Sequence, residues 1–283
     1  MRALTTRIGG MSVLAAALFF ACAPRAWAEF GPKPGKTTLD PGVLMIDEDK
    51  YLGANVIADY ALVDSKGAAL NLKDFLGKPL ILVLSYYDCE GACPTLNREL
   101  SKMLESLKRT RAGEDYRVLT LSFDKEDTDS KMTHFASMLG LSDGLGKGWT
   151  VARFKDNGDI KKFTDSVGYR FYWSTRERLF IHPSAYIVAS PEGRITRVLY
   201  GAYSGAKDME LAVLEAKSGK ETGSKFRDIS DMITVGCYSY NYSSGKYTLN
   251  YPLIISAASL FFGVSLVIGA LLLKKRGNKE EGI

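Results

Sequence analysis

Two cysteines, Cys89 and Cys93, stand between an apolar run and an amphipathic segment, and this arrangement restricts the fold more than any other part of the sequence. The run Pro79–Leu84 predicts a buried strand, and the apolar residues of Thr95–Lys108 have helical spacing. Pro94 suits the first turn of that helix, because it has no N–H to leave unpaired. The cysteines are therefore expected on a strand-to-helix turn, where free N–H groups stabilise a thiolate.

A structural disulfide between Cys89 and Cys93 is the alternative interpretation of the pair. A bridge that closes a loop of about five residues removes only about 2 kcal/mol of unfolded-state entropy, less than a bridge across a long loop. A short loop at the start of a helix makes a poor structural bridge and a good reactive site. The pair is therefore predicted to be redox-active.

The chain begins with a pattern typical of a signal peptide. Arg2 and Arg7 precede the apolar run 11–22, and the sequence Ala-Trp-Ala at 26–28 offers a cleavage site between small residues. Residues 1–28 are therefore predicted to be a signal peptide. Acylation of Cys22, as in a lipoprotein, is the alternative, and two bulky phenylalanines just upstream disfavour it.

A second membrane signal lies near the end of the chain. Pro252–Leu273 carries no charge and is long enough to cross a bilayer as a helix. Three basic residues, 274–276, follow at once and place that end in the cytoplasm. The N-terminal arginines predict that the N-terminal end also lies on the cytoplasmic side. The region between the two ends is therefore expected in the periplasm, and a single C-terminal span is expected to hold it in the inner (cytoplasmic) membrane. A buried core helix is the alternative, which the length and the basic stop disfavour.

Between these ends, predicted strands alternate with predicted helices, which indicates an α/β domain with a central mixed sheet. Strands are expected at 60–64, 68–72, 79–84, 117–123, 149–154, 184–189 and 194–200, and helices at 95–108, 130–139, 159–167 and 208–216. A thiol pair on the first strand-to-helix turn is the thioredoxin-like (redoxin) arrangement. With 46% hydrophobic residues among 283, the chain can bury one sizeable core.

The sequence also predicts how the chain is divided. Residues 29–56 are rich in Gly, Pro and Asp and are expected to form an extended lead-in, followed by the thioredoxin-like domain at 57–205. Residues 206–250 are expected to form a helix and a polar juxtamembrane segment, whose last part and Tyr251 hold five tyrosines that fit an interfacial aromatic belt. The transmembrane helix is assigned to 251–273 and a cytoplasmic tail to 274–283.

Three parts of the sequence resemble the Sco/SenC family: Tyr60–Pro94, Ser122–Thr128 and His182 just before the predicted strand Ser184–Ala189. The resemblance covers roughly residues 60–203, and its specific part is the Cys-x-x-x-Cys-Pro element with a distant histidine. Members are thioredoxin-fold copper proteins that help to assemble the copper site of cytochrome c oxidase. The family is usually anchored at the N-terminus, whereas this chain ends in the predicted span.

The resemblance implies a set of site residues. It makes Cys89, Cys93 and His182 the copper ligands, and it matches Asp124 and Asp127 to an Asp-rich turn of the family. It implies as partner the copper-site subunit of cytochrome c oxidase or another copper chaperone. For the two aspartates, a role in the turn or as a helix cap is an equal alternative.

The chemistry of these residues agrees with the resemblance. Two thiolates and one imidazole form a soft site of low coordination number, which suits Cu(I) and can hold Cu(II). Zinc with an open position takes the same ligands. The only other histidine, His134, lies on a predicted helix and is expected at the surface, while Cys237 is expected to be a free thiol.

Three functions remain to be compared. The first is a membrane-anchored copper chaperone, which is not an enzyme, and the second is a thiol–disulfide oxidoreductase that reduces a partner protein. Thiol exchange needs no third ligand, so the presence of His182 favours the metal-binding function. A peroxiredoxin-like peroxidase is disfavoured, since no Thr-x-x-Cys motif surrounds Cys89. The formal charge of +5, with Lys and Arg scattered among Asp and Glu, indicates no nucleic-acid partner.

Overall fold

The computed structural model describes residues 44–56, 59–89, 91–218, 234, 236–241 and 246–280, the last eleven of these by their backbone alone. The predicted signal peptide, Cys22, most of the lead-in and the end of the tail lie outside the described residues. The structural account below therefore concerns the domain, the segment that follows it and the C-terminal helix.

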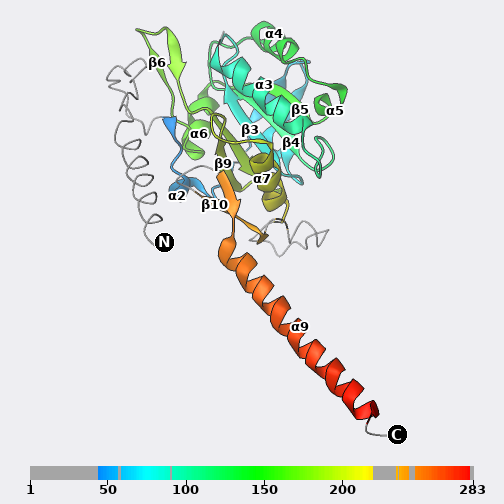
Figure 1. Cartoon of the computed structure of the whole chain (residues 1–283). Helices are drawn as coiled ribbons and strands as arrows, with labels where there is room; N and C mark the ends of the chain where they lie inside the picture. The colour runs from blue at the N-terminus through cyan, green and yellow to red at the C-terminus, as the bar shows by residue number, and fades with distance from the viewer. Residues whose placement is uncertain are drawn as a thin grey trace, which may run out of the picture. The chain divides into compact units, whose positions relative to one another are not determined.

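Within the described residues, seven strands form a mixed sheet at the centre of the domain (Figure 1). Their order across the sheet is β2-β1-β5-β4-β3-β8-β9. The three central strands β3, β4 and β5 are parallel, and the outer strands pair antiparallel. The strands are β1 (Ala61–Asp64), β2 (Ala69–Asn71), β3 (Leu80–Ser85), β4 (Arg117–Ser122), β5 (Trp149–Phe154), β8 (Ala185–Ala189) and β9 (Ile195–Tyr200).

Helices connect these strands in the alternating order that the sequence predicts, which confirms the mixed α/β class. The longer helices are α3 (Ala92–Glu105), α4 (Asp129–Leu139), α6 (Gly158–Ser166) and α7 (Ala206–Ser218), and the short ones are α2 (Glu48–Tyr51), α5 (Asp143–Gly146) and the 3₁₀ turn η2 (Leu72–Phe75). Thr128 caps α4 by accepting a hydrogen bond from the Lys131 N–H.

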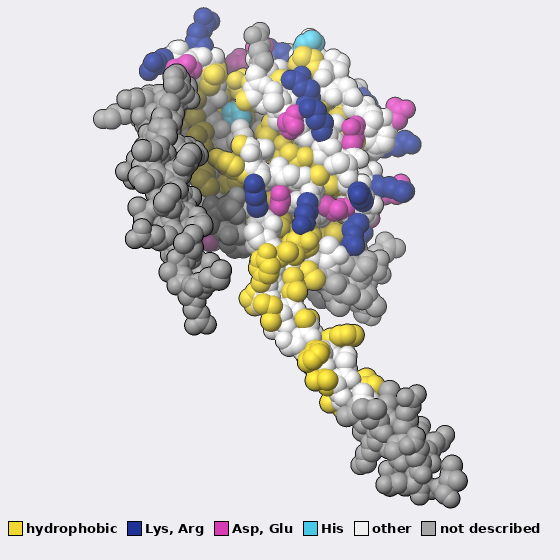
Figure 2. Space-filling view, in the orientation of Figure 1, with side chains coloured by type: hydrophobic (Ala, Val, Ile, Leu, Met, Phe, Trp, Pro, Cys, Tyr) yellow, Lys and Arg dark blue, Asp and Glu magenta, His cyan; other side chains and the backbone are white. Residues whose placement is uncertain are grey.

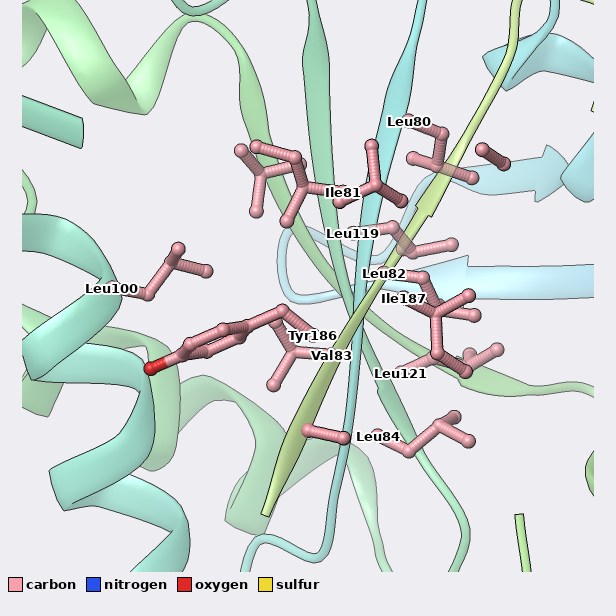
Figure 3. Packing of buried hydrophobic residues seen from close by; sticks show 14 of the residues in the cluster. Leu80, Ile81, Leu82, Val83, Leu84, Leu100, Leu119, Leu121, Tyr186 and Ile187 are labelled. Atoms are coloured by element: carbon pink, nitrogen blue, oxygen red, sulfur yellow. The ribbon is translucent and has the colours of Figure 1, made fainter. Parts of the chain in front are cut away.

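The core lies on both faces of strand β3. All of its residues are buried, which explains why the strand appears in the sequence as a continuous apolar run. Figure 3 shows Val83 and Tyr186 pointing toward Leu100 of helix α3, whereas Leu82 and Leu84 point to the other face. Full burial of each such aliphatic side chain stabilises the fold by about 1.5–3 kcal/mol, so β3 is held firmly where it meets the cysteine turn.

The structure differs from the sequence-based elements in several places. Helix α3 begins at Ala92, three residues earlier than predicted, and ends at Glu105. The predicted loop 140–148 contains α5, and the predicted lead-in contains α2. Two short hairpins were not predicted: β6 (Tyr172–Ser174) with β7 (Leu179–Ile181), and β10 (Tyr238–Asn241) with β11 (Lys246–Leu249).

The second hairpin corrects the prediction of an aromatic belt for two tyrosines. Tyr240 is buried and donates from its hydroxyl to the Val198 carbonyl at 2.8 Å. Tyr247 donates to Glu215 of α7 at 2.5 Å, and Glu215 pairs with Arg197 of β9 at 2.6 Å. These side chains attach the hairpin to β9 and α7, because a buried ion pair and buried hydroxyls need protein partners in place of water.

Helix α9 (Tyr251–Glu280) follows the hairpin and confirms the C-terminal apolar helix. Its first part, Tyr251–Gly269, is long and apolar enough to cross a membrane. Its apolar side chains are exposed and appear as a yellow column in Figure 2. The helix continues through the basic residues that were expected to end it.

The buried ion pair gives a first prediction. Arg197→Ala should lower the free energy of unfolding by about 3 kcal/mol, because it leaves the Glu215 carboxylate buried without its cation. Lys161→Ala, which removes an exposed pair with Asp165, should cost less than about 0.5 kcal/mol. The measurement is urea unfolding of the detergent-solubilised chain, followed by tryptophan fluorescence. Equal losses in the two variants would contradict the stabilising role of the buried pair.

Candidate metal centre

The two cysteines lie where strand β3 passes into helix α3. Cys89 follows the turn after β3, and Cys93 is the second residue of α3. Both are free thiols and both are buried, with 7% of Cys89 and 1% of Cys93 exposed. The backbone N–H of Cys93 donates to the Cys89 sulfur at 3.4 Å, so the start of the helix points a donor at that sulfur.

The protein environment shifts the pKa values of the two thiols in opposite directions. A hydrogen bond from the Cys93 thiol lowers the pKa of Cys89 to about 5, assisted by the Tyr86 hydroxyl and by backbone N–H groups. The same hydrogen bond, together with burial, raises the pKa of Cys93. At neutral pH the pair therefore holds a thiolate at Cys89 and a proton at Cys93.

The distant histidine meets this pair. His182 lies between β7 and β8, and its Nε2 is 3.6 Å from the Cys93 sulfur. Burial lowers the pKa of His182, so the ring is neutral at pH 7. A tetrahedral ion with metal–sulfur and metal–nitrogen distances of about 2.3 and 2.0 Å separates its S and N ligands by about 3.5 Å. Cys93 and His182 thus have the spacing of two ligands of one ion.

Aromatic rings surround His182. Tyr86 and Phe123 contact its ring, with centroids 6.1 and 5.3 Å away, and Tyr169 places its hydroxyl 2.8 Å from Nδ1. The sequence shows Tyr169 only as the first residue of an aromatic run, and nothing in it indicates a contact with His182. Phe180 of the unpredicted β6–β7 hairpin also packs against Tyr86.

A cavity of about 950 Å³ opens beside the site. Cys89 and His182 line it, whereas Cys93 does not. Aromatic side chains such as Phe171 and Trp173 and charged side chains such as Lys125 line its walls. The cavity is far larger than a metal ion, and an incoming group would meet Cys89 and His182 before Cys93.

The two candidate aspartates do not complete a ligand set. Asp127 is buried and accepts hydrogen bonds from the Tyr87 N–H at 2.9 Å and from the Ser122 hydroxyl. Its other oxygen, Oδ1, has no hydrogen-bond partner among the residues that the structure describes, and burial raises the pKa of the Asp127 carboxyl to about 6. The Asp124 carboxylate accepts from the backbone N–H of Glu126 at 3.0 Å and lines the cavity. These contacts are those of residues that fix turns.

Among the described residues, no group of three or more Cys, His, Asp or Glu side chains lies close enough together to hold a metal ion. The assignment of Cys89, Cys93 and His182 as ligands therefore stays a prediction, supported by the contacts above. The remaining candidates lie elsewhere: His134 is exposed on α4, and Cys237 is a half-buried thiol beside β10.

The separated pKa values give a second prediction. Alkylation of Cys89 by iodoacetamide should be at its full rate at pH 7 and fall only as the pH drops through about 5, because the thiolate is the reacting form. Cys93→Ala should move this midpoint upward, because it removes the side-chain donor that stabilises the Cys89 thiolate. The measurement is peptide mass spectrometry of the reduced chain over a pH series. A midpoint near the ordinary value of about 8.5 would contradict the assignment.

Comparison with known proteins gives the family. A family model described as SCO1/SenC matches residues 48–213, more than half of the chain. A search of curated proteins gives no match.

Several solved structures are similar to this chain. A proposed electron transfer protein from Aquifex aeolicus VF5 is 34% identical, with a TM-score of 0.54, over 61% of this chain and 98% of that one. BsSco, a member of the Sco family of cytochrome c oxidase assembly proteins with an identified disulfide switch, is 19% identical, with a TM-score of 0.51, over 60% and 98%. Arabidopsis thaliana ScoI, solved with copper bound, is 18% identical, with a TM-score of 0.47, over 57% and 97%. The likeness to BsSco confirms the thioredoxin-like fold.

Proposed function

Because this chain belongs to the SCO1/SenC family, we propose that it is a membrane-anchored copper chaperone that delivers or primes copper for assembly of the cytochrome c oxidase copper site. The observation that carries the proposal is the contact between Cys93 and His182, 3.6 Å apart, beside the Cys89 thiolate. Copper is the cargo, and the proposed partner of this protein is the copper-site subunit of the oxidase or another copper chaperone.

The donor set suits copper better than a hard metal. Thiolates and a neutral imidazole are soft ligands that favour Cu(I), and carboxylates are not part of the set. Cys89 is already a thiolate, and His182 is already neutral, so only Cys93 must lose its proton when the metal binds. Copper binding should therefore release about one proton from the site.

The cysteine pair can be reduced, as two thiols, or oxidised, as a disulfide. A disulfide between Cys89 and Cys93 leaves no thiolate, so the oxidised chain cannot use these sulfurs as ligands. A disulfide switch has been identified in BsSco. We infer that reduction of the pair precedes copper loading in this chain.

A thiol–disulfide oxidoreductase is the second candidate, and the unequal thiols favour it. A low-pKa Cys89 that lines the cavity suits the attacking role, and a buried Cys93 suits the resolving role. His182 separates the two functions, because thiol exchange between Cys89, Cys93 and a partner needs no third ligand. A zinc site with the same ligands is an outcome that metal analysis would reveal.

The proposed cellular location and membrane topology rest on the sequence signals near the two ends of the chain. We propose a signal peptide at residues 1–28, a periplasmic domain and a single span in the inner membrane. The described helix Tyr251–Gly269 supports the span. We propose the thioredoxin-like domain at 57–205, and the helices α2 and α7, which lie outside these bounds, contact strand β9.

Metal binding tests the proposal directly. The reduced chain should bind one copper ion, Cys89→Ser or Cys93→Ser should abolish tight binding, and His182→Ala should weaken it, because each change removes one ligand. Oxidised protein should bind none until it is reduced. The measurement is Cu(I) titration against a competing chelator, and His134→Ala is the matched control, since that histidine is exposed on α4.

Unchanged affinity in His182→Ala would exclude the three-ligand site. In cells, the same variant separates the two candidate functions: a copper chaperone should lose oxidase assembly in copper-poor medium, whereas a thiol reductase should retain it. Full oxidase activity from a stable, normally abundant His182→Ala chain would therefore leave the reductase.

The membrane arrangement gives a further prediction. Cys237 should react with a membrane-impermeant thiol reagent from the periplasmic side, after mild reduction and local unfolding, while Lys274 and Lys275 should be protected from an impermeant amine reagent. The reason is that positive residues stay on the cytoplasmic side of a span. Mass spectrometry of labelled spheroplasts measures both, and lysed cells provide the control in which every site reacts. Labelling with the opposite sidedness would exclude this topology.

A further inference from the structure

Tyr169 has a role that neither the sequence nor the proposed function assigns. The residue is buried in the loop after α6, and its hydroxyl lies near three polar atoms. These are Nδ1 of His182 at 2.8 Å, the Pro183 carbonyl at 3.0 Å and the Leu84 carbonyl at 3.2 Å. One hydroxyl thus touches both the end of β3 and the histidine loop.

The protons in this group can be placed by counting donors. Carbonyl oxygens only accept, and a tyrosine hydroxyl has a single proton to donate. Nδ1 of His182 lies 3.0 Å from the Pro183 carbonyl as well, so the two can bond only if Nδ1 carries the proton. The Tyr169 hydroxyl then accepts from Nδ1–H and donates to a carbonyl. In this arrangement the neutral imidazole has its lone pair on Nε2, the atom that faces the Cys93 sulfur.

We propose that Tyr169 is a positioning residue that holds His182 in the Nδ1–H tautomer and directs the Nε2 lone pair at Cys93. The contact to the Leu84 carbonyl extends this role, because Leu84 belongs to the strand that leads to Cys89. Tyr169 therefore connects the histidine with the strand that carries the cysteines. The link to metal rests on the proposed function, whereas the tautomer of His182 does not.

The fold holds the Tyr169 ring firmly enough for this role. The ring lies 28° from parallel to that of His182 and packs against Phe123 at 5.6 Å. The preceding Gly168 has a φ of +70°, and a Cβ there would lie 2.5 Å from the Tyr51 ring. A left-handed, close-packed glycine therefore sets the direction in which the chain enters Tyr169.

Tyr169→Phe tests the proposal, because it keeps the ring and removes only the hydroxyl. Tyr186→Phe is the matched control: Tyr186 is equally buried, and its hydroxyl donates to the Leu96 carbonyl without contact to His182. The first readout is a long-range ¹H–¹⁵N spectrum of the reduced, metal-free full chain in detergent. With two histidines in the sequence, the exposed His134 serves as the internal reference.

In the unchanged chain and in Tyr186→Phe, the spectrum should show His182 with its proton on Nδ1. In Tyr169→Phe, the Nδ1 and Nε2 resonances should move toward each other as the second tautomer becomes populated. The second readout is Cu(I) affinity, which should fall at least tenfold in Tyr169→Phe and less than twofold in Tyr186→Phe. Loss of a hydrogen bond to a metal-bound histidine typically costs 10–100-fold in affinity.

An unchanged His182 spectrum in Tyr169→Phe would overturn the proposal, and so would an equal change in Tyr186→Phe, which would show a general loss of packing. If the unchanged chain binds no copper, the proposed function fails, and the tautomer shift alone decides the role of Tyr169.

Discussion

The antiparallel pairing of β8 with β3 is the constraint on which the site depends. Leu80 pairs with Ala189 and Val83 with Tyr186, so the start of β8 lies beside the end of β3. The cysteine turn follows β3, and His182 lies three residues before the start of β8. Two segments almost ninety residues apart in the sequence therefore meet at one edge of the sheet. A parallel pairing would have placed His182 at the opposite edge.

Hydrogen bonds and burial together decide the charge of the groups at that edge. A thiol hydrogen bond and backbone N–H groups stabilise the Cys89 thiolate, whereas desolvation keeps His182 neutral. Behind them, Asp127 accepts from the Tyr87 N–H and fixes the turn that leads to Cys89. Hydrogen bonds and burial thus leave two of the three proposed ligands in the protonation state that binds a soft metal.

The sequence predicted the parts of this structure that depend on local pattern. The long apolar runs of β3, β4 and β8 and the helix after the cysteines have strong local signals, and the family resemblance supplied His182. The hairpins β6–β7 and β10–β11 were missed, because strands of three or four residues are stabilised by what they pack against. The contact of Tyr169 with His182 could not be predicted either, since it depends on how two loops meet across the sheet.

The cavity connects the two candidate functions. Cys89 and His182 line it, and the Cys93 sulfur lies behind them, so a partner's ligand or thiol reaches Cys89 first. In metal transfer, an incoming ligand would replace Cys89 while Cys93 and His182 still hold the ion from the buried side. In thiol exchange, Cys89 would attack and Cys93 would close the disulfide. Both reactions would begin at the Cys89 sulfur, and in the proposed ligand set His182 would help to hold the metal while Cys89 is replaced.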